Sequence, residues 1–301
     1  MRYVVTGAAG FIGSHLADAL VEGGHDVVAV DCLTDYYDPA EKEENARGLD
    51  LLRIDLAEES LDLDGVDGVF HLAGQPGVRS FGEAFPLYLR RNVLATQRVF
   101  DAASTAGLRV VFASSSSIYG EAERYPTPEG TVPEPISPYG ITKLACEQLA
   151  RAYGLDSVAL RYFTVYGPRQ RPDMLFRRIC DALTSGGTIE IYGTGEQSRS
   201  FTEVGDVVDA TIAAMAEAPA GAVYNVGGGD EASLLEAVAL LEEISGRPLD
   251  VRHLDRARGD VRRTQADVSR IRDALGWEPR VPLARGLERM WAWASARVAT
   301  P

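Results

Sequence analysis

The sequence predicts an α/β protein with a doubly wound parallel sheet and a smaller C-terminal α/β lobe. Through the first half of the chain, short apolar segments alternate with longer segments of helical periodicity, which is typical of parallel βαβ units. A turn rich in glycine follows the first apolar segment and leads into the first helical one. Both observations favour strands that run in one direction, with helices on both faces of the sheet.

The elements of the first half follow in chain order. Residues 3–5 are apolar or aromatic, which is typical of a short buried strand. Residues 11–21 place apolar side chains at helical spacing, so a helix follows the glycine turn. The same reasoning predicts strands at residues 26–30, 66–72, 109–113 and 158–163, and long helices at residues 85–106 and 138–153.

The second half begins with a polar loop, residues 168–174, that is rich in proline and arginine. Beyond it, the pattern predicts helices at residues 175–184, 206–217, 234–245, 268–275 and 283–298, and strands at residues 189–192 and 222–226. We expect every connection to be short, as in a compact chain. The larger domain is expected to contain residues 1–165, with residues 200–228 returning to it, and the smaller lobe residues 166–199 and 229–301.

The composition of the chain limits the classes of protein to which it can belong. At 301 residues, 46% hydrophobic and 25% charged, the chain has an ordinary globular composition. It has no apolar run near the roughly 20 residues that span a bilayer and no secretory signal, so we expect a cytoplasmic protein without a membrane partner. Its three cysteines and four histidines lack the spacing of a disulfide framework or a metal site, so no metal is expected.

The formal net charge of −14 argues against a nucleic-acid partner, because such proteins carry a basic surface. One segment is nevertheless basic, with Arg161, Arg169, Arg171, Arg177 and Arg178 close together in the chain. A guanidinium binds phosphate or carboxylate through two parallel hydrogen bonds, so this cluster suits a small anionic ligand. A solvated charged surface is the alternative interpretation.

The glycine turn has the spacing and position of a dinucleotide-binding site. Gly7 allows a tight turn, Gly10 lets the backbone approach a pyrophosphate, and Gly13 lets helix and strand pack closely. The helix N-terminus then supplies N–H groups and a positive dipole end to the phosphates.

An acidic residue after the second strand completes this pattern. Asp31 can accept hydrogen bonds from the adenosine ribose and would repel a 2′-phosphate, which favours NAD over NADP. Asp55 and Leu56, after the third strand, are candidates to reach the adenine.

Tyr139 and Lys143 are candidate catalytic residues. The chain has only two lysines, Lys42 and Lys143, and Lys143 lies one helical turn after Tyr139. Residues four apart share a helix face, and a nearby ammonium favours phenolate, so we expect a Tyr139 pKa below the reference of about 10. Such a phenol is a general base usable near neutral pH. On spacing alone, an incidental pair on a surface helix is an equal alternative.

These motifs resemble the extended short-chain dehydrogenase/reductase family, whose members mostly act on nucleotide-sugars. The resemblance covers essentially the whole chain, because residues 71–75, 114–120, 161–163, 259–261 and 275–279 also match in family order. It implies a Rossmann domain that binds NAD and a lobe that binds a nucleotide-sugar. The implied cofactor contacts are Gly7, Gly10, Phe11, Ile12, Gly13, Asp31, Asp55, Leu56, Leu72, Ala73, Gln75, Asn92, Ala113, Tyr139, Lys143 and Tyr162.

The resemblance also implies a third catalytic group, a hydroxyl at the end of the strand before the active-site helix. Ser115 matches this position, with Ser114 and Ser116 as its neighbours. Related 4,6-dehydratases carry Asp-Glu directly after the hydroxyl, and nucleotide-glucuronate decarboxylases carry a Glu two residues after it. Ser116 and Ser117 stand there instead, and neither can do carboxylate acid–base work. A 4-epimerase remains, with a net oxidoreductase or decarboxylase and a non-catalytic NAD-binding protein as alternatives.

Residues 161–174, 33–38 and 74–79 further resemble UDP-glucuronate 4-epimerases. By that resemblance, Thr164 and Arg171 hold the sugar carboxylate. The implied substrate contacts are Arg79, Ser115, Ser116, Tyr139, Thr164, Arg171, Met174, Ile191, Tyr192, Arg199 and Arg258, with Arg256 as the alternative to Arg258 and a core position as the alternative for Tyr192.

The resemblance therefore implies NAD-dependent epimerisation of UDP-glucuronate to UDP-galacturonate, with UDP-glucose as the nearest alternative substrate. It also implies a homodimer formed through the two long helices at residues 85–106 and 138–153.

Overall fold

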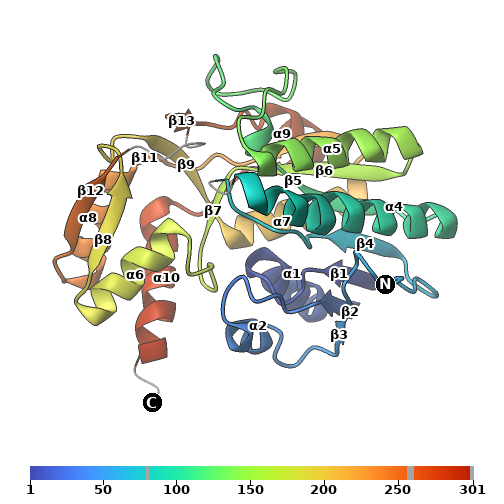
Figure 1. The fold of residues 1–301 in the computed structure, drawn as a ribbon, viewed down its shortest axis with the longest axis horizontal. Coiled ribbons are helices and arrows are strands. Elements are labelled where there is room, and N and C mark those ends of the chain that lie inside the picture. The colour runs from blue at the N-terminus through green and yellow to red at the C-terminus, as the bar shows by residue number, and fades with distance from the viewer. Residues whose placement is uncertain (79–80, 256–260, 299–301) are drawn as a thin grey trace.

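A seven-stranded parallel sheet forms the larger part of the molecule (Figure 1). The structure is a computed structural model that describes residues 1–78, 81–255 and 261–298. The spatial order of the strands is β10 (Val223–Val226), β6 (Ser157–Tyr162), β5 (Val110–Ser115), β4 (Gly68–His71), β1 (Arg2–Thr6), β2 (Asp26–Asp31) and β3 (Leu51–Arg53). Every pairing between neighbours is parallel, which confirms the predicted doubly wound sheet.

Helices cover both faces of this sheet because its strands are apolar on both sides. Val4 and Val5, adjacent on β1, are fully buried in two different apolar cores. One core packs under α1 (Phe11–Glu22) and α7 (Val204–Glu217), the other under α4 (Ala95–Ala106) and α5 (Pro138–Tyr153). The chain reverses its direction across the sheet at β1 and β4, where doubly wound sheets open a crevice for ligands.

The two long helices were predicted, and their details bear on the site. α5 begins at Pro138 because the Ser137 side chain caps its first turn and proline suits the first helical position. The predicted helix at residues 85–106 is continuous but irregular, since a π-helical turn interrupts it. Its parts are α3 (Phe85–Tyr88), the π-helical turn η2 (Leu89–Leu94) and α4. Such turns are frequent at functional sites.

The smaller lobe lies to one side of the large sheet and has its own apolar core around Phe176, Leu287 and Met290 (Figure 1). Its elements are β7 (Thr164–Tyr166), β9 (Ser198–Glu203), β11 (Glu231–Ser233) and β13 (Arg263–Thr264) in one sheet, β8 (Thr188–Tyr192) and β12 (Asp250–Leu254) in another, and α6 (Leu175–Ser185), α8 (Leu234–Ser245) and α10 (Leu283–Val298). α7 and β10 return to the large sheet, where α9 (Ser269–Leu275) also packs. In the described part of the chain, no helix is long and apolar enough to cross a membrane.

The expectation that every connection is short is wrong for residues 119–137, which lead from the short turn η3 (Ser116–Ile118) to α5. This segment has no helix or strand, and buried polar contacts fix its position instead. Arg161 Nη1 donates hydrogen bonds to the Tyr119 hydroxyl at 2.8 Å and to the Glu129 carbonyl at 3.0 Å. Long connections inside a compact domain need such partners for their polar groups.

Candidate active site

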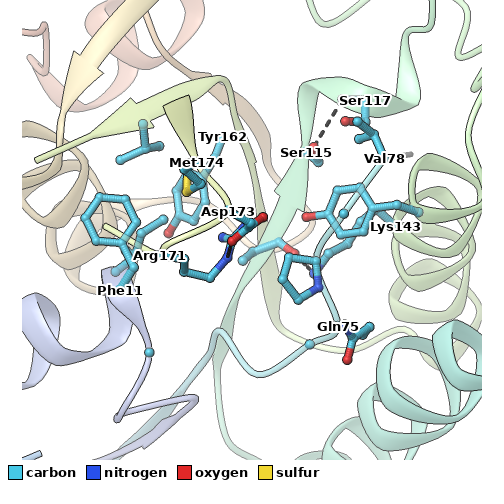
Figure 2. A pocket seen from close by; sticks show the side chains of 18 of the residues that line it. Phe11, Gln75, Val78, Ser115, Ser117, Lys143, Tyr162, Arg171, Asp173 and Met174 are labelled. Carbon is cyan, nitrogen blue, oxygen red and sulfur yellow. Dashed lines mark hydrogen bonds and ion pairs between the residues drawn. The ribbon is translucent and has the colours of Figure 1, made fainter. Parts of the chain in front are cut away.

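One cavity of about 720 Å³ lies where the carboxyl ends of the large sheet meet the smaller lobe (Figure 2). Of the predicted site residues that the structure describes, all but Asn92 line it: Gly7, Gly10, Phe11, Ile12, Gly13, Asp31, Asp55, Leu56, Leu72, Ala73, Gln75, Ala113, Ser115, Ser116, Tyr139, Lys143, Tyr162, Thr164, Arg171, Met174, Ile191, Tyr192 and Arg199. Arg79, Arg256 and Arg258 lie outside the described residues.

The glycine turn meets the steric requirements that its spacing predicted. Gly7 has a φ of +73°, and a Cβ on it would lie 2.8 Å from the backbone nitrogen of Ala73. A Cβ on Gly13 would collide with the Gly7 carbonyl oxygen, so α1 packs directly on the turn. Side chains are thus excluded from a helix N-terminus that opens on the cavity, and this cradle fits the pyrophosphate of a dinucleotide.

Asp31 connects the glycine turn to the segment that follows β2. Its carboxylate accepts hydrogen bonds from the N–H groups of Leu33 at 2.8 Å and Ala9 at 3.3 Å. Burial raises the pKa of Asp31 above its ordinary value, although the Leu33 N–H and the Lys42 ammonium oppose this shift. A carboxylate offers about four acceptor positions, so Asp31 can also accept from a ribose hydroxyl.

Lys42, in α2 (Pro39–Asn45), is a site residue to which sequence reasoning gave no role. Its Nζ donates to the Thr34 carbonyl at 2.5 Å and to the Thr34 hydroxyl at 2.9 Å, and it lies 4.5 Å from the centre of the Tyr37 ring. A signal for it was present, because the chain has only two lysines and both line this cavity.

Asn92 lies behind the cavity wall, where its side chain holds the loop after β4. Its Oδ1 accepts from the Gln75 N–H at 2.6 Å, and its Nδ2 donates to the Gln75 carbonyl and to the Thr142 hydroxyl, both at 3.0 Å. These bonds occupy the amide and join the loop to α5. The structure therefore shows Asn92 as a support for Gln75, and its contact with the cofactor stays a prediction.

Tyr139 and Lys143 line the same cavity from α5, as their spacing predicted. Lys143 Nζ lies 5.8 Å from the centre of the Tyr139 ring and donates to the Ala113 carbonyl at 2.8 Å. That hydrogen bond fixes the ammonium at the end of β5, near the loop that Asn92 supports. An ammonium has three donors, so it can also bind a ligand in the cavity.

The alternation of side chains along β5 separates the two serines at its end. Ser114 Oγ donates to the Glu147 carboxylate at 2.5 Å, whereas Ser115 Oγ accepts from the Ser117 N–H at 3.1 Å. Figure 2 shows Ser115 and Lys143 on one side of the cavity and Arg171 on the other. This geometry favours Ser115 over Ser114 as the hydroxyl that meets a substrate.

The five arginines between residues 161 and 178 do not converge on one ligand, contrary to the expectation from their spacing. The three that do not line the cavity pair with carboxylates: Arg161 with Glu147, Arg169 with Asp18, and Arg177 with Glu41. Only Arg171 and Arg178 line the cavity. An acidic chain offers many carboxylates, and a buried guanidinium needs such a partner to offset its loss of hydration.

Arg171 reaches the cavity from the loop between β7 and α6 (Figure 2). Its Nε and Nη2 donate to the two carboxylate oxygens of Asp173, each at 3.0 Å. Tyr36, from the segment after β2, donates to the same carboxylate at 3.2 Å. Burial lowers the pKa of Arg171, but the Asp173 carboxylate more than offsets this, and the net pKa is raised. Sequence reasoning missed the parts played by Asp173 and Tyr36.

The residues predicted to contact a diphosphate and a uridine line the cavity from the smaller lobe. Ile191 and Tyr192 end β8, and Arg199 lies on β9. The Arg199 guanidinium donates to the carbonyl oxygens of Val261 and Arg262, at 2.6 Å and 3.1 Å. Within the residues that the structure describes, no cluster of His, Cys, Asp and Glu could hold a metal ion.

Comparison with known proteins agrees with this fold and this cavity. Residues 3–227 match the NAD dependent epimerase/dehydratase family. A protein of Bacillus subtilis strain 168, named uncharacterized UDP-glucose epimerase YtcB, is 40% identical over 318 residues, which cover 98% of each chain.

Two solved structures are also similar over nearly the whole chain. UDP-glucuronic acid 4-epimerase from Bacillus cereus, in complex with UDP-glucuronic acid and NAD, has a TM-score of 0.95 and 37% identity, over 99% of this chain and 100% of that one. MoeE5 in complex with UDP-glucuronic acid and NAD has a TM-score of 0.89 and 43% identity at the same coverage. MoeE5 has also been solved with UDP-glucose and NAD.

The chain therefore belongs to the NAD dependent epimerase/dehydratase family, within the extended short-chain dehydrogenases/reductases that its motifs resembled. NAD is accordingly its cofactor, and the glycine cradle with Asp31 fits that dinucleotide.

Proposed function

We propose that this protein is an isomerase that converts UDP-glucuronate to UDP-galacturonate by NAD-dependent epimerisation at carbon 4. One observation carries the proposal: Ser115 and Lys143 lie on one side of the cavity, and Arg171 lies on the other (Figure 2). A group that activates a hydroxyl faces a group that binds a carboxylate, and a uronate carries both.

The proposed chemistry uses Tyr139 as the base that takes the proton of the carbon 4 hydroxyl and later returns it. Ser115 hydrogen-bonds that oxygen, and Lys143, fixed by the Ala113 carbonyl, stabilises the phenolate by its charge. When bound, NAD supplies the acceptor and then the donor of the carbon 4 hydride. Between the two proton transfers the 4-keto sugar presents its opposite face, so the configuration at carbon 4 inverts.

Two features support epimerisation over the competing outcomes. Ser116 and Ser117 line the cavity, and neither supplies a carboxylate for elimination or decarboxylation. The 4-keto uronate is a β-keto acid, which loses carbon dioxide when the bond from the ring to its carboxylate lies perpendicular to the ketone plane. Thr164 and Arg171 are proposed to keep this carbon–carboxylate bond near that plane, which removes the orbital overlap that decarboxylation needs.

The rest of the nucleotide-sugar is proposed to lie along the smaller lobe. Residues 1–165 with 200–228 bind NAD in this proposal, and residues 166–199 and 229–301 bind the sugar nucleotide. The contacts proposed there are Met174, Ile191, Tyr192, Arg199 and Arg258, and Arg79 is proposed as a further contact from residues 1–165.

UDP-glucose is the second candidate substrate, because MoeE5 was solved with either sugar nucleotide. Incubation of the NAD-loaded protein with each substrate, followed by proton NMR of the products, separates the two. We expect UDP-galacturonate to form from UDP-glucuronate. Accumulating NADH or carbon dioxide would contradict an epimerase, and full NAD occupancy without turnover of either sugar would indicate a binding protein.

We also propose a homodimer formed through α5 and the helical run at residues 85–106. Leu87, Leu94 and Ile141 are exposed apolar side chains on these helices. Light scattering is expected to give twice the chain mass, and Ile141→Glu to give a monomer. A cytoplasmic location is the accompanying proposal, supported by three cysteines that are all free thiols.

A further inference from the structure

Asp173 occupies only one edge of the Arg171 guanidinium. The Nε and Nη2 atoms of Arg171 donate to its two oxygens, each at 3.0 Å, which is the geometry of a bidentate pair. The side chains of Arg171 and Asp173 are 20% and 41% exposed, and both line the cavity. A ligand in the cavity can therefore reach this pair.

Within the described part of the chain, no hydrogen bond occupies the neighbouring edge of the guanidinium. Among residues 1–78, 81–255 and 261–298, Nη1 of Arg171 has no hydrogen-bond partner. A guanidinium carries five N–H donors in a rigid planar fork, so a second carboxylate can bind the edge formed by Nη1 and Nη2. Once Asp173 holds the first edge, the direction of the second edge is fixed.

Tyr36, which follows β2 of the large sheet, holds the pair of Arg171 and Asp173 in position. Its hydroxyl donates to Asp173 at 3.2 Å, and the guanidinium carbon of Arg171 lies 6.0 Å from the centre of its ring. Burial, together with the Asp173 charge, raises the pKa of Tyr36 to about 12, so the phenol keeps its proton as a donor at neutral pH. Tyr36 belongs to the segment at residues 33–38, for which the proposed catalytic residues provide no role.

We propose that Asp173, itself held by Tyr36, is a positioning residue for Arg171 and thereby sets the preference for a uronate over a neutral hexose. This inference rests on the proposed function, in which Arg171 binds the sugar carboxylate. An untethered arginine has many rotamers and must lose that freedom when the substrate binds. The tether removes this cost in advance, and a neutral sugar, which makes no such contact, does not benefit.

The opposite role for Asp173 is competition, since its negative charge also repels a second carboxylate. The two roles predict opposite signs when Asp173 is removed. Positioning predicts weaker binding of UDP-glucuronate, whereas competition predicts tighter binding. The observed geometry favours positioning, because the two carboxylates can occupy different edges of the fork.

The test measures Kd for UDP-glucuronate and for UDP-glucose by calorimetry on the NAD-loaded protein, together with kcat for UDP-glucuronate. For Asp173→Ala we expect the Kd of UDP-glucuronate to rise about tenfold, and for Tyr36→Phe about threefold. The Kd of UDP-glucose and kcat at saturation are expected to stay within about twofold. Tyr153→Phe is the matched control, because its hydroxyl bonds Gln97 outside the cavity.

A double-mutant cycle separates positioning from a general structural role. In an Arg171→Ala background, Asp173→Ala is expected to change neither Kd further, because its effect passes through Arg171. An unchanged or lowered Kd for UDP-glucuronate in the single variant would overturn the proposal, as would a further rise in that background. If the wild type binds UDP-glucuronate without epimerising it, the proposed function fails, while the two Kd values still decide the role of Asp173.

Discussion

Glu147 accepts two hydrogen bonds from Arg161, at 2.9 Å and 2.7 Å, in an ion pair whose side chains are only 5% and 7% exposed. The same carboxylate accepts a third hydrogen bond from Ser114 Oγ at 2.5 Å. Glu147 follows Tyr139 and Lys143 at four-residue intervals on one face of α5. The ion pair therefore fixes the helix that carries both catalytic candidates against β5 and β6.

Glu147→Ala tests this relationship, because it leaves the Arg161 guanidinium buried without a counter-charge. We expect the free energy of unfolding to fall by about 3–5 kcal/mol, measured by urea denaturation. The control is Glu288→Ala, which removes the exposed pair of Arg285 with Glu288 and is expected to cost less than about 1 kcal/mol. Equal losses in the two variants would mean that burial does not set the strength of the Glu147 contact.

Gly13→Ala tests the glycine cradle. The new Cβ would meet the Gly7 carbonyl oxygen, which is backbone and cannot rotate away. We expect a loss of about 1–3 kcal/mol in unfolding free energy from overpacking, and a fall in bound NAD measured by chromatography of the denatured protein. Gly130→Ala is the control, since a Cβ there meets open space. Full NAD occupancy in the Gly13 variant would contradict the assignment of this turn to the pyrophosphate.

The parts of the fold and site that could be predicted from the sequence depend on residues close together in the chain. The glycine turn and the start of α5 at Pro138 follow from local spacing, and the choice of Ser115 came from the family resemblance. Contacts between distant segments gave no such pattern. Tyr36 and Asp173 are 137 residues apart, and no periodicity in the sequence links them.

Asn92 illustrates a second limit. Its place in family order predicted a cofactor contact, but the sequence does not say which way an amide points. In the structure both of its donors and one acceptor position bond Gln75 and Thr142, so it supports the wall of the cavity from behind. For Lys42 the opposite holds. As one of only two lysines it stood out in the sequence, but no local pattern predicted its contact with Thr34.

Tyr139→Phe tests the proposed base by removing one oxygen. We expect kcat to fall by about 10²–10⁴-fold, since a positioned acid–base group contributes about that much, while NAD content and the Kd of the sugar nucleotide are retained. Turnover by NMR and calorimetric binding give the two readouts. Tyr153→Phe, on the same helix, is expected to keep full activity. A Tyr139→Phe enzyme with wild-type kcat would exclude the phenol as the base.

His71, at the end of β4, predicts how stability depends on pH. It is buried, with Nδ1 2.7 Å from the Thr6 hydroxyl and Nε2 2.9 Å from the Thr96 hydroxyl. Burial, and secondarily the Lys143 charge, lowers the pKa of His71 from 6.5 to about 3. Between these two values the unfolded chain binds a proton that the folded chain does not. The stabilisation from neutral His71 is therefore complete above about pH 6.5 and is lost as the pH falls toward 3.

His71→Gln removes this titration, so the variant isolates its contribution. Each pH unit inside the window changes stability by at most about 1.4 kcal/mol. The unfolding free energy of the wild type should therefore exceed that of His71→Gln by about 2 kcal/mol more at pH 7 than at pH 5. Urea denaturation of both proteins at the two pH values measures the difference. The difference in unfolding free energy between the two proteins could instead be the same at pH 7 and pH 5, or larger at pH 5. The folded protein would then accept the proton at least as readily as the unfolded chain, and the two threonine hydroxyls would not hold the ring neutral.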